Sequence, residues 1–376
     1  MLAHIFSLSI LFVLVQAASR TSPPSGAIIV RPGTTTSGEF KTIQSAVNSL
    51  PSDGSARSIF LFPGTYTEQV SITRNGALTI YGYTSDTSTY TQNQATIAFG
   101  LGADTAGSND ASGTLRVHSD NFRLYNVNVK NTRGAGIQAI ALSQYGNRAG
   151  FYACGLYGYQ DTLLANQGNQ VYLKGYIEGK TDFIFGQQGS AYFGGNTIAI
   201  KGPSHITASG RSSADSTSCE LLAFTQYPLV LTNDPPNPPF QTSSTPTPSS
   251  KPPVQNPEPV EATTLVVPGG HTLSTFENRV IFKNTIVNIP PKAGLWSLWN
   301  GDPASVSNTL FADFNTTGPG ASGISRESFA TLLTASQANA YSISSAVGSD
   351  YASWVDTSYV VCFRKSEGWV QTGKPA

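Results

Sequence analysis

The sequence has little charge, little cysteine and only one short apolar run. Charged residues make up 12% of the 376, and 22 acidic residues balance 22 basic ones. No basic excess indicates a nucleic-acid partner, and no acidic run indicates a solvating tail. Three cysteines allow at most one disulfide. A packed core rather than a disulfide framework must therefore stabilise the fold.

The apolar run covers residues 5–15 and is followed by the small residues Ala17 and Ala18. This pattern is typical of a secretory signal peptide, here over residues 1–17. The run is too short to cross a bilayer, and no other segment is long enough. We therefore expect a secreted, extracellular protein, with no membrane span and no nucleic-acid partner, that acts as a monomer. The glycosylation sequon at Asn315 fits a loop of such a protein.

Glycine (36 residues) and aromatic residues (10%) are abundant, as in β-rich proteins with many turns. Residues 41–50 place apolar side chains on one helical face and are followed by Pro51, which predicts a short helix. Another helical pattern appears only at 327–335. Predicted strands cover residues 58–62, 77–81, 114–117 and 123–129.

A repeat distinguishes among the β architectures. Tyr152, Tyr172 and Tyr192 recur at steps of 20 residues in similar segments, and Tyr125 fits with a longer step of 27. A period near 20 with strands and no helix predicts a β-solenoid, with the helix at 41–50 capping its open N-terminal end. A β-sandwich is the alternative.

Residues 221–276 break this pattern, because ten prolines fall between Pro235 and Pro259. Proline cannot donate to a strand ladder, so we expect no solenoid coil here. The segment is interpreted as an extended, disordered insert or as an artefact of the gene model. It divides the solenoid into an N-terminal part, 18–220, and a C-terminal part, 277–362, which an atypical tail follows at 363–376.

Two aspartates and two glutamines form the candidate chemical site. Asp161 and Asp182 are 21 residues apart, and Gln138 precedes Asp161 by 23, so each step is about one coil. Residues one coil apart lie roughly 4.8 Å from each other on adjacent strands. When two carboxyl groups lie this close, one tends to keep its proton while the other is ionised and can act as a nucleophile. The side-chain amides of Gln138 and Gln160 can donate hydrogen bonds that stabilise an oxyanion. Alternatively, Asp161 is a turn residue and Asp182 is a helix N-cap or a residue of a strand ladder.

Several motifs resemble those of pectin methylesterases, also called pectinesterases, and most closely the fungal members. GYQDTL at 158–163 and DFIFG at 182–186 are similar to the two central motifs of the family. Weaker likenesses are GTYTE at 64–68, QAIAL at 138–142 and ITASGR at 206–211. The resemblance implies a right-handed parallel β-helix that removes methyl esters from the galacturonate units of pectin, with no cofactor and no metal.

The resemblance also assigns roles to residues. Asp182 would attack the ester carbonyl, while Asp161 would protonate the leaving methanol and then activate water. Gln138 and Gln160 would stabilise the oxyanion. Phe185 would pack against a sugar ring. Trp296 and Trp299 resemble a tryptophan pair that stacks on sugars, with packing in the core or a cap as the alternative.

One family motif, Leu-Gly-Arg-Pro-Trp, has no counterpart here. Its arginine pairs with the nucleophilic aspartate, yet no arginine and no tryptophan occurs between residues 212 and 278. Three interpretations follow. The sequence as written contains mis-spliced sequence in place of the motif, or the protein is a catalytically impaired pectin-binding β-helix. In the third, Arg211 or Arg279 takes the place of the missing arginine beside the aspartate. Three other enzyme classes are disfavoured. The sequence lacks the Asp-Asp dipeptide of polygalacturonases and shows no calcium-binding cluster of acidic residues of the kind that lyases of this shape use. It also lacks the G-x-S-x-G motif of serine esterases.

Overall fold

The computed structural model describes residues 18–202, 205–209, 221–225, 228–231, 264–268, 278–288, 295–298 and 309–361. The predicted signal peptide, Arg211, Trp299 and the predicted tail lie outside these residues. In the part of the chain that the structure describes, no helix is both long and apolar enough to cross a bilayer.

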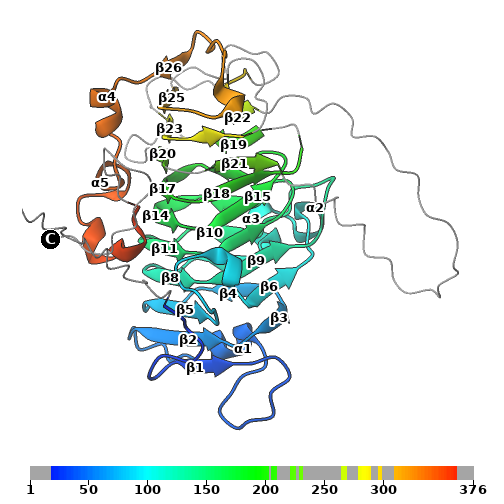
Figure 1. The fold of residues 1–376 in the computed structure, drawn as a ribbon. Coiled ribbons are helices and arrows are strands. Elements are labelled where there is room, and N and C mark those ends of the chain that lie inside the picture. The colour runs from blue at the N-terminus through cyan, green and yellow to red at the C-terminus, as the bar shows by residue number, and fades with distance from the viewer. Residues whose placement is uncertain are drawn as a thin grey trace, which may run out of the picture.

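The strands form three parallel sheets, which run along a stack of coils from β1 to β26 (Figure 1). The first sheet has 11 strands, in spatial order β1 (Ile28–Val30), β2 (Arg57–Leu61), β5 (Leu78–Gly82), β8 (Phe122–Tyr125), β11 (Ala149–Tyr152), β14 (Gln167–Leu173), β17 (Gln188–Gly194), β20 (Leu221–Thr225), β23 (Asn278–Lys283), β25 (Thr309–Phe314) and β26 (Ala330–Leu332). The second has eight strands, β3 (Gly64–Thr67), β6 (Ala95–Phe99), β9 (Val127–Asn131), β12 (Gly155–Tyr157), β15 (Tyr176–Gly179), β18 (Thr197–Ile200), β21 (Pro228–Leu231) and β24 (Ile286–Val287). The third has seven strands, β4 (Val70–Ile72), β7 (Leu115–Val117), β10 (Leu142–Gln144), β13 (Leu163–Ala165), β16 (Ile184–Gly186), β19 (His205–Ser209) and β22 (Thr264–Pro268). The solenoid prediction is confirmed: the fold is a right-handed parallel β-helix.

The helices are short and lie outside the coils. The α-helices are α1 (Ile43–Asn48), α2 (Ala103–Ala106), α3 (Asn109–Ser112), α4 (Ala335–Asn339) and α5 (Ile343–Val347). Single 3-10 turns are η1 (Tyr90–Gln92), η4 (Pro319–Ala321), η5 (Tyr351–Ser353) and η6 (Thr357–Tyr359). The helical pattern predicted at 327–335 is wrong, because β26 occupies its middle and pairs with β25. The helix begins at Ala335, where Thr334 forms a capping box with Gln337.

One left-handed residue makes the corner between the first and second sheets in several coils. Asn126, Ala153, Lys174 and Gly195 have φ of 52°, 49°, 55° and 66° and each follows a strand of the first sheet. A single residue in this conformation turns the chain without a loop. The strand predicted at 123–129 is therefore two strands, β8 and β9, which meet at Asn126.

From β11 to β17 the repeat of the coils is 21 residues rather than 20, which corrects the tyrosine alignment. Tyr172 pairs with Phe151 on one side and with Phe193 on the other. These three rings stack inside the coil, with centroids 4.8 and 4.7 Å apart. Tyr152 instead pairs with Leu173. Because side chains alternate between the faces of a strand, the one-residue slip moves Tyr152 to the opposite face of the first sheet.

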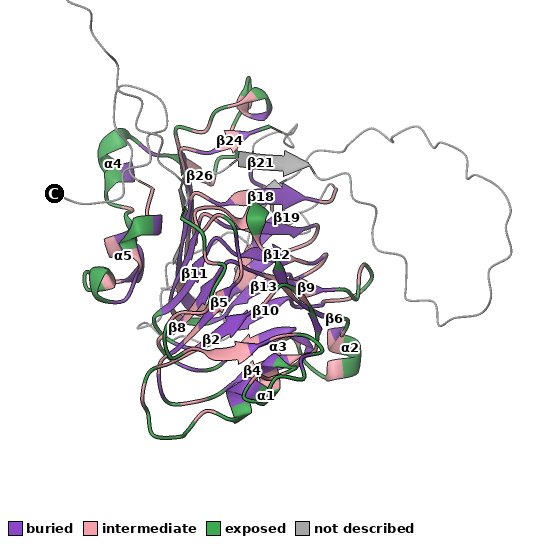
Figure 2. Ribbon diagram, turned by 60° about the horizontal axis from the view of Figure 1, so that its bottom comes forward, coloured by how far each residue is buried: buried purple, intermediate pink, exposed green. Residues whose placement is uncertain are grey.

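That opposite face is covered by the C-terminal elements. α5 packs against β14, β17 and β20, and Figure 1 shows α4 and α5 beside the stack. Tyr152 and Tyr359 belong to this second apolar layer, with ring centroids 5.2 Å apart. In Figure 2 the helices of this layer keep exposed outer surfaces while the strands beneath them are buried. The first sheet is thus covered on both faces, one by the coil interior and one by this layer.

α1 caps the N-terminal end of the stack, as predicted. Its apolar face is buried at Ile43, Ala46 and Val47. The two oxygens of the Glu68 carboxylate accept hydrogen bonds from the backbone N–H groups of Ile43 and Gln44, at 2.7 and 2.9 Å. A carboxylate at a helix N-terminus satisfies free N–H groups and is attracted by the helix dipole. This contact gives the GTYTE motif a structural role.

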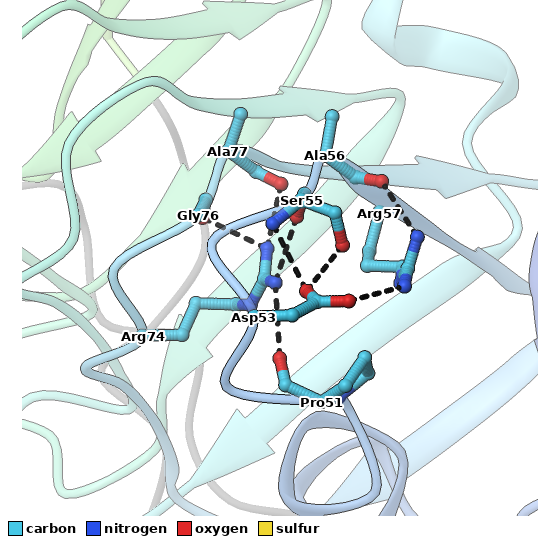
Figure 3. Close-up of polar contacts among 8 residues, drawn as sticks. All are labelled: Pro51, Asp53, Ser55, Ala56, Arg57, Arg74, Gly76 and Ala77. Carbon is cyan, nitrogen blue, oxygen red and sulfur yellow. Dashed lines mark hydrogen bonds and ion pairs between the residues drawn. The ribbon is translucent and has the colours of Figure 1, made fainter.

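A second polar anchor holds the first coils together. The Arg74 guanidinium donates to the carbonyl oxygens of Gly76 and Ala77 on its own turn, at 2.8 and 2.7 Å, and to that of Ser55 on the preceding coil, at 2.9 Å (Figure 3). In the same view, Asp53 pairs with Arg57 at 3.0 Å.

The predicted boundaries of the insert need correction. β20 and β21 lie within 221–276, yet they pair with β17 and β18, and β22 pairs with β19. The coils therefore continue to Leu231 and include Thr264–Pro268. Pro228 is tolerated because it is the first residue of its strand. The ten prolines of 235–259 lie outside the described residues.

Candidate active site

The candidate residues gather where the chain passes from the second sheet to the third. Asp161 lies between β12 and β13, and Asp182 lies at the same place one coil later, between β15 and β16. The register Leu163–Ile184 and the bridge between Gln160 and Thr181 fix this 21-residue step. The structure therefore brings the two aspartates onto successive coils at one edge of the solenoid, as predicted from their spacing.

Backbone hydrogen bonds fix both aspartates. The Asp161 N–H donates to the Thr181 carbonyl at 3.0 Å, and the Asp182 N–H donates to the His205 carbonyl at 2.8 Å. Each aspartate is thus tied to the next coil. Their left-handed φ angles of 64° and 50° turn the chain sharply just before a strand of the third sheet. Asp is one of the few residues besides glycine that tolerate this conformation.

The two carboxyls differ in acidity. Burial and, second, the charge of Asp182 raise the pKa of Asp161 to about 8, while a hydrogen bond from Asn109 opposes the rise. Burial raises the pKa of Asp182 to about 6. Between these values Asp161 keeps its proton while Asp182 is ionised. An acid and an anion side by side can serve as a proton donor and a nucleophile at the same pH.

Gln138 and Gln160 lie on adjacent coils at the same edge, both partly exposed. The Ala139 N–H donates to the Gln160 carbonyl at 3.2 Å, so the segment that carries Gln138 runs beside Gln160. Phe185 is partly exposed in the middle of β16, between Leu164 and Ala208 of the neighbouring strands. The structure brings these three residues and both aspartates to one place.

Trp296 is not part of this surface. Its side chain is 1% exposed and packs against Phe282 and Phe311, with ring centroids 5.6 and 5.3 Å apart. The ring has no open face for a sugar, so the core alternative describes this residue, and the expected stacking role does not fit its position. Trp299 lies outside the described residues.

Two residues at the site were missed from the sequence. The Asn109 amide of α3 donates to Asp161 Oδ2 at 3.2 Å, and Nδ1 of His205 lies 3.9 Å from Asp182 Oδ1. Asn109 follows no repeat, because α3 is an excursion outside the coils. His205 follows Asp182 by 23 residues, the spacing that had indicated Gln138, and could have been found in the same way.

The neighbour of Asn109 anchors α3 to the third sheet. Asp110 accepts hydrogen bonds from Arg116 and Ser143, at 2.5 and 2.7 Å, and lies 3.1 Å from His118 Nε2. These partners hold α3 beside the aspartate pair. Among the described residues, no group of three or more histidine, cysteine, aspartate or glutamate side chains has the arrangement of a metal site.

A parallel β-helix with a buried carboxyl pair of unequal acidity at one edge has the architecture of a solenoid enzyme. Comparison with known proteins defines the family. The family model named Pectinesterase matches residues 28–227. A probable pectinesterase A of Aspergillus fumigatus is 36% identical over 92% of this chain and 93% of its own length. The chain therefore belongs to the pectinesterase family and is an enzyme of the pectin methylesterase class.

Solved structures agree with this assignment. The crystal structure of the pectin methylesterase from Aspergillus niger superposes with a TM-score of 0.74 at 32% identity, covering 91% of this chain and 100% of that one. The pectin methylesterase from carrot superposes with a TM-score of 0.71 at 21% identity, covering 89% of this chain and 97% of that one. The carrot enzyme supports the fold alone.

Proposed function

We propose that this chain removes methyl esters from galacturonate units of pectin, with Asp182 as the nucleophile and Asp161 as the general acid and base. The observation that supports this assignment most directly is the placement of the two carboxyl-bearing residues on successive coils at one edge of the solenoid. Burial raises the pKa of Asp182 to about 6 and that of Asp161, with the charge of Asp182 as a second cause, to about 8. In the window between them, each group is in the protonation state that its role requires.

The first half of the reaction forms an acyl-enzyme. A carboxylate oxygen of Asp182 attacks the ester carbonyl carbon, and the negative charge moves to the carbonyl oxygen. Collapse of this tetrahedral species breaks the bond to methoxide, which takes the proton of Asp161 and leaves as methanol. The products are methanol, an anhydride between galacturonate and Asp182, and an ionised Asp161.

The second half returns the enzyme to its starting state. Asp161, now a carboxylate, accepts a proton from water as the water oxygen attacks the anhydride carbonyl. The bond to Asp182 breaks, which releases the galacturonic acid group and restores the ionised nucleophile; the acid then loses its proton to the solvent. In both halves the amides of Gln138 and Gln160 are the proposed donors to the oxyanion. Phe185 is partly exposed and lies three residues after Asp182 on the same coil, and it is proposed to contact a sugar ring.

The remaining assignments are also proposals. The apolar run at 5–15 and the small residues that follow it support secretion, with cleavage of the signal peptide after residue 17. We expect the mature chain to be a monomer that binds methyl-esterified homogalacturonan. N-terminal sequencing of the secreted protein tests the cleavage site, and sedimentation tests the monomer.

Methanol release from methylated pectin is the test of the reaction. Asp182→Asn should lower kcat by on the order of a thousandfold, and Asp161→Asn by about 100- to 10,000-fold. Asp350→Asn is the matched control, because Asp350 is an exposed partner of Arg148 on the opposite flank. The proposal fails if Asp182→Asn retains the activity of the control. If the unaltered chain binds pectin and releases no methanol, the impaired binding protein is the better description.

A further inference from the structure

The Asp182 carboxylate has an incomplete set of partners. Its side chain is 18% exposed, and Oδ1 is buried and accepts no hydrogen bond from the described residues. The nearest charged partner recorded for it is His205, whose Nδ1 lies 3.9 Å from Oδ1 and whose side chain is 27% exposed. A buried anion without a partner resists ionisation, so a neighbouring cation changes how this carboxyl titrates.

His205 is held in place by its own backbone. It is the first residue of β19, which pairs with β16, the strand that begins two residues after Asp182. The His205 carbonyl also accepts the Asp182 N–H at 2.8 Å. These contacts fix the backbone of His205 beside Asp182, so only a rotation of its side chain can change the distance between the imidazole and the carboxylate.

Other charged groups of these coils are engaged elsewhere. Asp161 acts on the same site with a like charge, which opposes ionisation of the pair. Glu178 forms an ion pair with Lys201 at 2.5 Å, and Lys180 lies 5.9 Å from the Tyr159 ring. Of the described titratable groups near Asp182, His205 is the one whose charge changes in the mildly acidic range, since histidine ordinarily gains its proton near pH 6.5.

We propose that His205 is a positioning residue for the nucleophile, whose imidazolium keeps the Asp182 carboxylate ionised and oriented in mildly acidic solution. This inference rests on the proposed function, because it assigns His205 to the group that attacks the ester. When the imidazole carries a proton, the imidazolium and the carboxylate attract each other, so the ion pair persists where an isolated buried carboxyl would take up a proton. The reaction then continues at a lower pH than burial of Asp182 alone would allow.

The test is the pH profile of kcat/KM for methanol release, measured from pH 4 to 9 for the full chain and three variants. His205→Gln removes the charge at similar size and should move the acid-side midpoint up by about one pH unit. This shift gives a roughly tenfold loss at pH values well below the midpoint and little change at pH 7.5. His205→Arg supplies a permanent cation and should leave the midpoint at or below that of the unaltered chain.

Arg57→Gln is the matched control, because it removes a cation whose exposed partner is Asp53 rather than Asp182. Its acid-side midpoint should stay in place. If His205→Gln does not fold, His205→Lys, which retains a cation, should preserve the acid-side midpoint. The inference is overturned if the His205→Gln profile superposes on that of the unaltered chain, or falls equally at every pH. Asp182→Asn separates the two proposals: if it retains full activity, the assigned nucleophile itself is incorrect.

A second observation concerns Asn315, near the C-terminal end of the stack. Asn315 is the first residue of the single N-x-[ST] sequon in the sequence, with Thr317 at its third position. It is exposed, has a left-handed φ of 52°, and follows β25 directly. Its Nδ2 donates to Asn284 Oδ1 at 2.9 Å, which requires only one of the two amide hydrogens. A glycan on this nitrogen therefore leaves the contact with Asn284 intact.

We infer that Asn315 carries an N-linked glycan when the chain is secreted by a eukaryotic host. Digestion of the secreted protein with an N-glycosidase should increase its mobility and convert Asn315 to aspartate. Thr317→Ala should abolish the shift, whereas Thr317→Ser, which keeps the sequon, should retain it. Secreted protein that shows no change in mass at the peptide containing Asn315 would overturn this assignment.

Discussion

Asp161 and Asp182 share one backbone conformation, a left-handed turn that places each at the start of a strand of the third sheet, one coil apart. Outside glycine this conformation costs about 1–2 kcal/mol per residue. Aspartate tolerates the conformation better than most residues, because its short polar side chain can bond locally. The same conformation recurs at the corners Asn126 and Ala153, so it belongs to the geometry of the coils, which here sets the two carboxyl-bearing residues beside each other.

We predict a bell-shaped pH dependence of kcat/KM. Activity needs an ionised Asp182, whose pKa is about 6, and a protonated Asp161, whose pKa is about 8. Activity should therefore rise on an acid limb set by Asp182, with a midpoint at about pH 6 from burial and lower where the His205 imidazolium stabilises the carboxylate, and should decline above pH 8. Stopped-time methanol assays in buffers of constant ionic strength measure the two limbs. A flat profile between pH 4 and 9 would contradict the assigned protonation states.

Asp161→Asn should increase stability while it removes activity. In the folded chain Asp161 holds its proton up to about pH 8, whereas in the unfolded chain it ionises near pH 4. The folded state therefore binds more protons between these values, and the free energy of unfolding falls as the pH rises from about 4 to about 8. The neutral amide removes this term.

Urea denaturation at pH 4.5 and 7.5 measures the effect. The Asn variant should be more stable than the unaltered chain at pH 7.5, by on the order of 2 kcal/mol, and nearly equal to it at pH 4.5. Asp350→Asn should show no such difference, since that carboxylate is exposed. An Asp161→Asn variant that loses stability at both pH values would show that the carboxylate has a structural role.

The sequence predicted those features that depend on spacing along the chain. The solenoid, the capping helix and the meeting of Asp161 with Asp182 all follow from periods and motifs. The corner at Asn126 was missed, because a single left-handed residue leaves no gap between the apolar patterns of β8 and β9. The tyrosine register was wrong by one residue, because aromatic side chains fill both faces of the first sheet and the pattern therefore does not reveal which face is which.

Other features depend on contacts that the sequence pattern does not contain. Trp296 matched a motif, yet its position among Phe282 and Phe311 is decided by how the coils pack. Asn109 reaches Asp161 from α3, a helix too short to leave a periodic signal. The strands β20 and β21 were assigned to the insert because the prolines that follow them dominated the composition of the segment.

The stacked rings inside the coil should be sensitive at Tyr172. Its hydroxyl donates to Gln170 Oε1 at 2.6 Å, and both side chains are buried. Tyr172→Phe leaves this oxygen without its donor and should cost about 1–2 kcal/mol. Tyr172→Ala also removes the ring between Phe151 and Phe193 and should cost about 3–5 kcal/mol. Thermal or urea denaturation measures both, and equal costs for the two variants would contradict a packed ring ladder.

The left-handed backbone conformation of the corners can be tested by replacing alanine with glycine at one corner and glycine with alanine at another. Ala153 has a φ of 49° at the corner where Gly195 has 66° two coils later. Ala153→Gly relieves the strain of the Cβ, but it adds the entropic cost of glycine and removes a buried methyl group, so it should change the stability by less than about 0.5 kcal/mol. Gly195→Ala should destabilise it by about 1–2 kcal/mol. Part of this cost arises because the new Cβ would lie 2.7 Å from Val361 Cγ2. An Ala153→Gly variant that loses as much stability as Gly195→Ala would contradict a shared corner.

Arg74 should contribute to stability without a role in catalysis. Its guanidinium donates to the carbonyl oxygens of Gly76, Ala77 and Ser55, which tie the first two coils together (Figure 3). Arg74→Ala removes these hydrogen bonds, although the Ala77 carbonyl keeps the backbone N–H of Arg57 as a donor, and should lower the free energy of unfolding by about 2–3 kcal/mol. The free energy of unfolding of Arg74→Lys should lie between those of the unaltered chain and of Arg74→Ala, because an ammonium group cannot reproduce the planar fork of guanidinium donors. Arg57→Ala is the control, since its exposed pair with Asp53 at 3.0 Å should contribute at most about 0.5 kcal/mol. Urea denaturation ranks the three variants, and kcat/KM below the unfolding transition should be the same for all of them. If Arg57→Ala costs as much as Arg74→Ala, the carbonyl contacts are not what holds these coils.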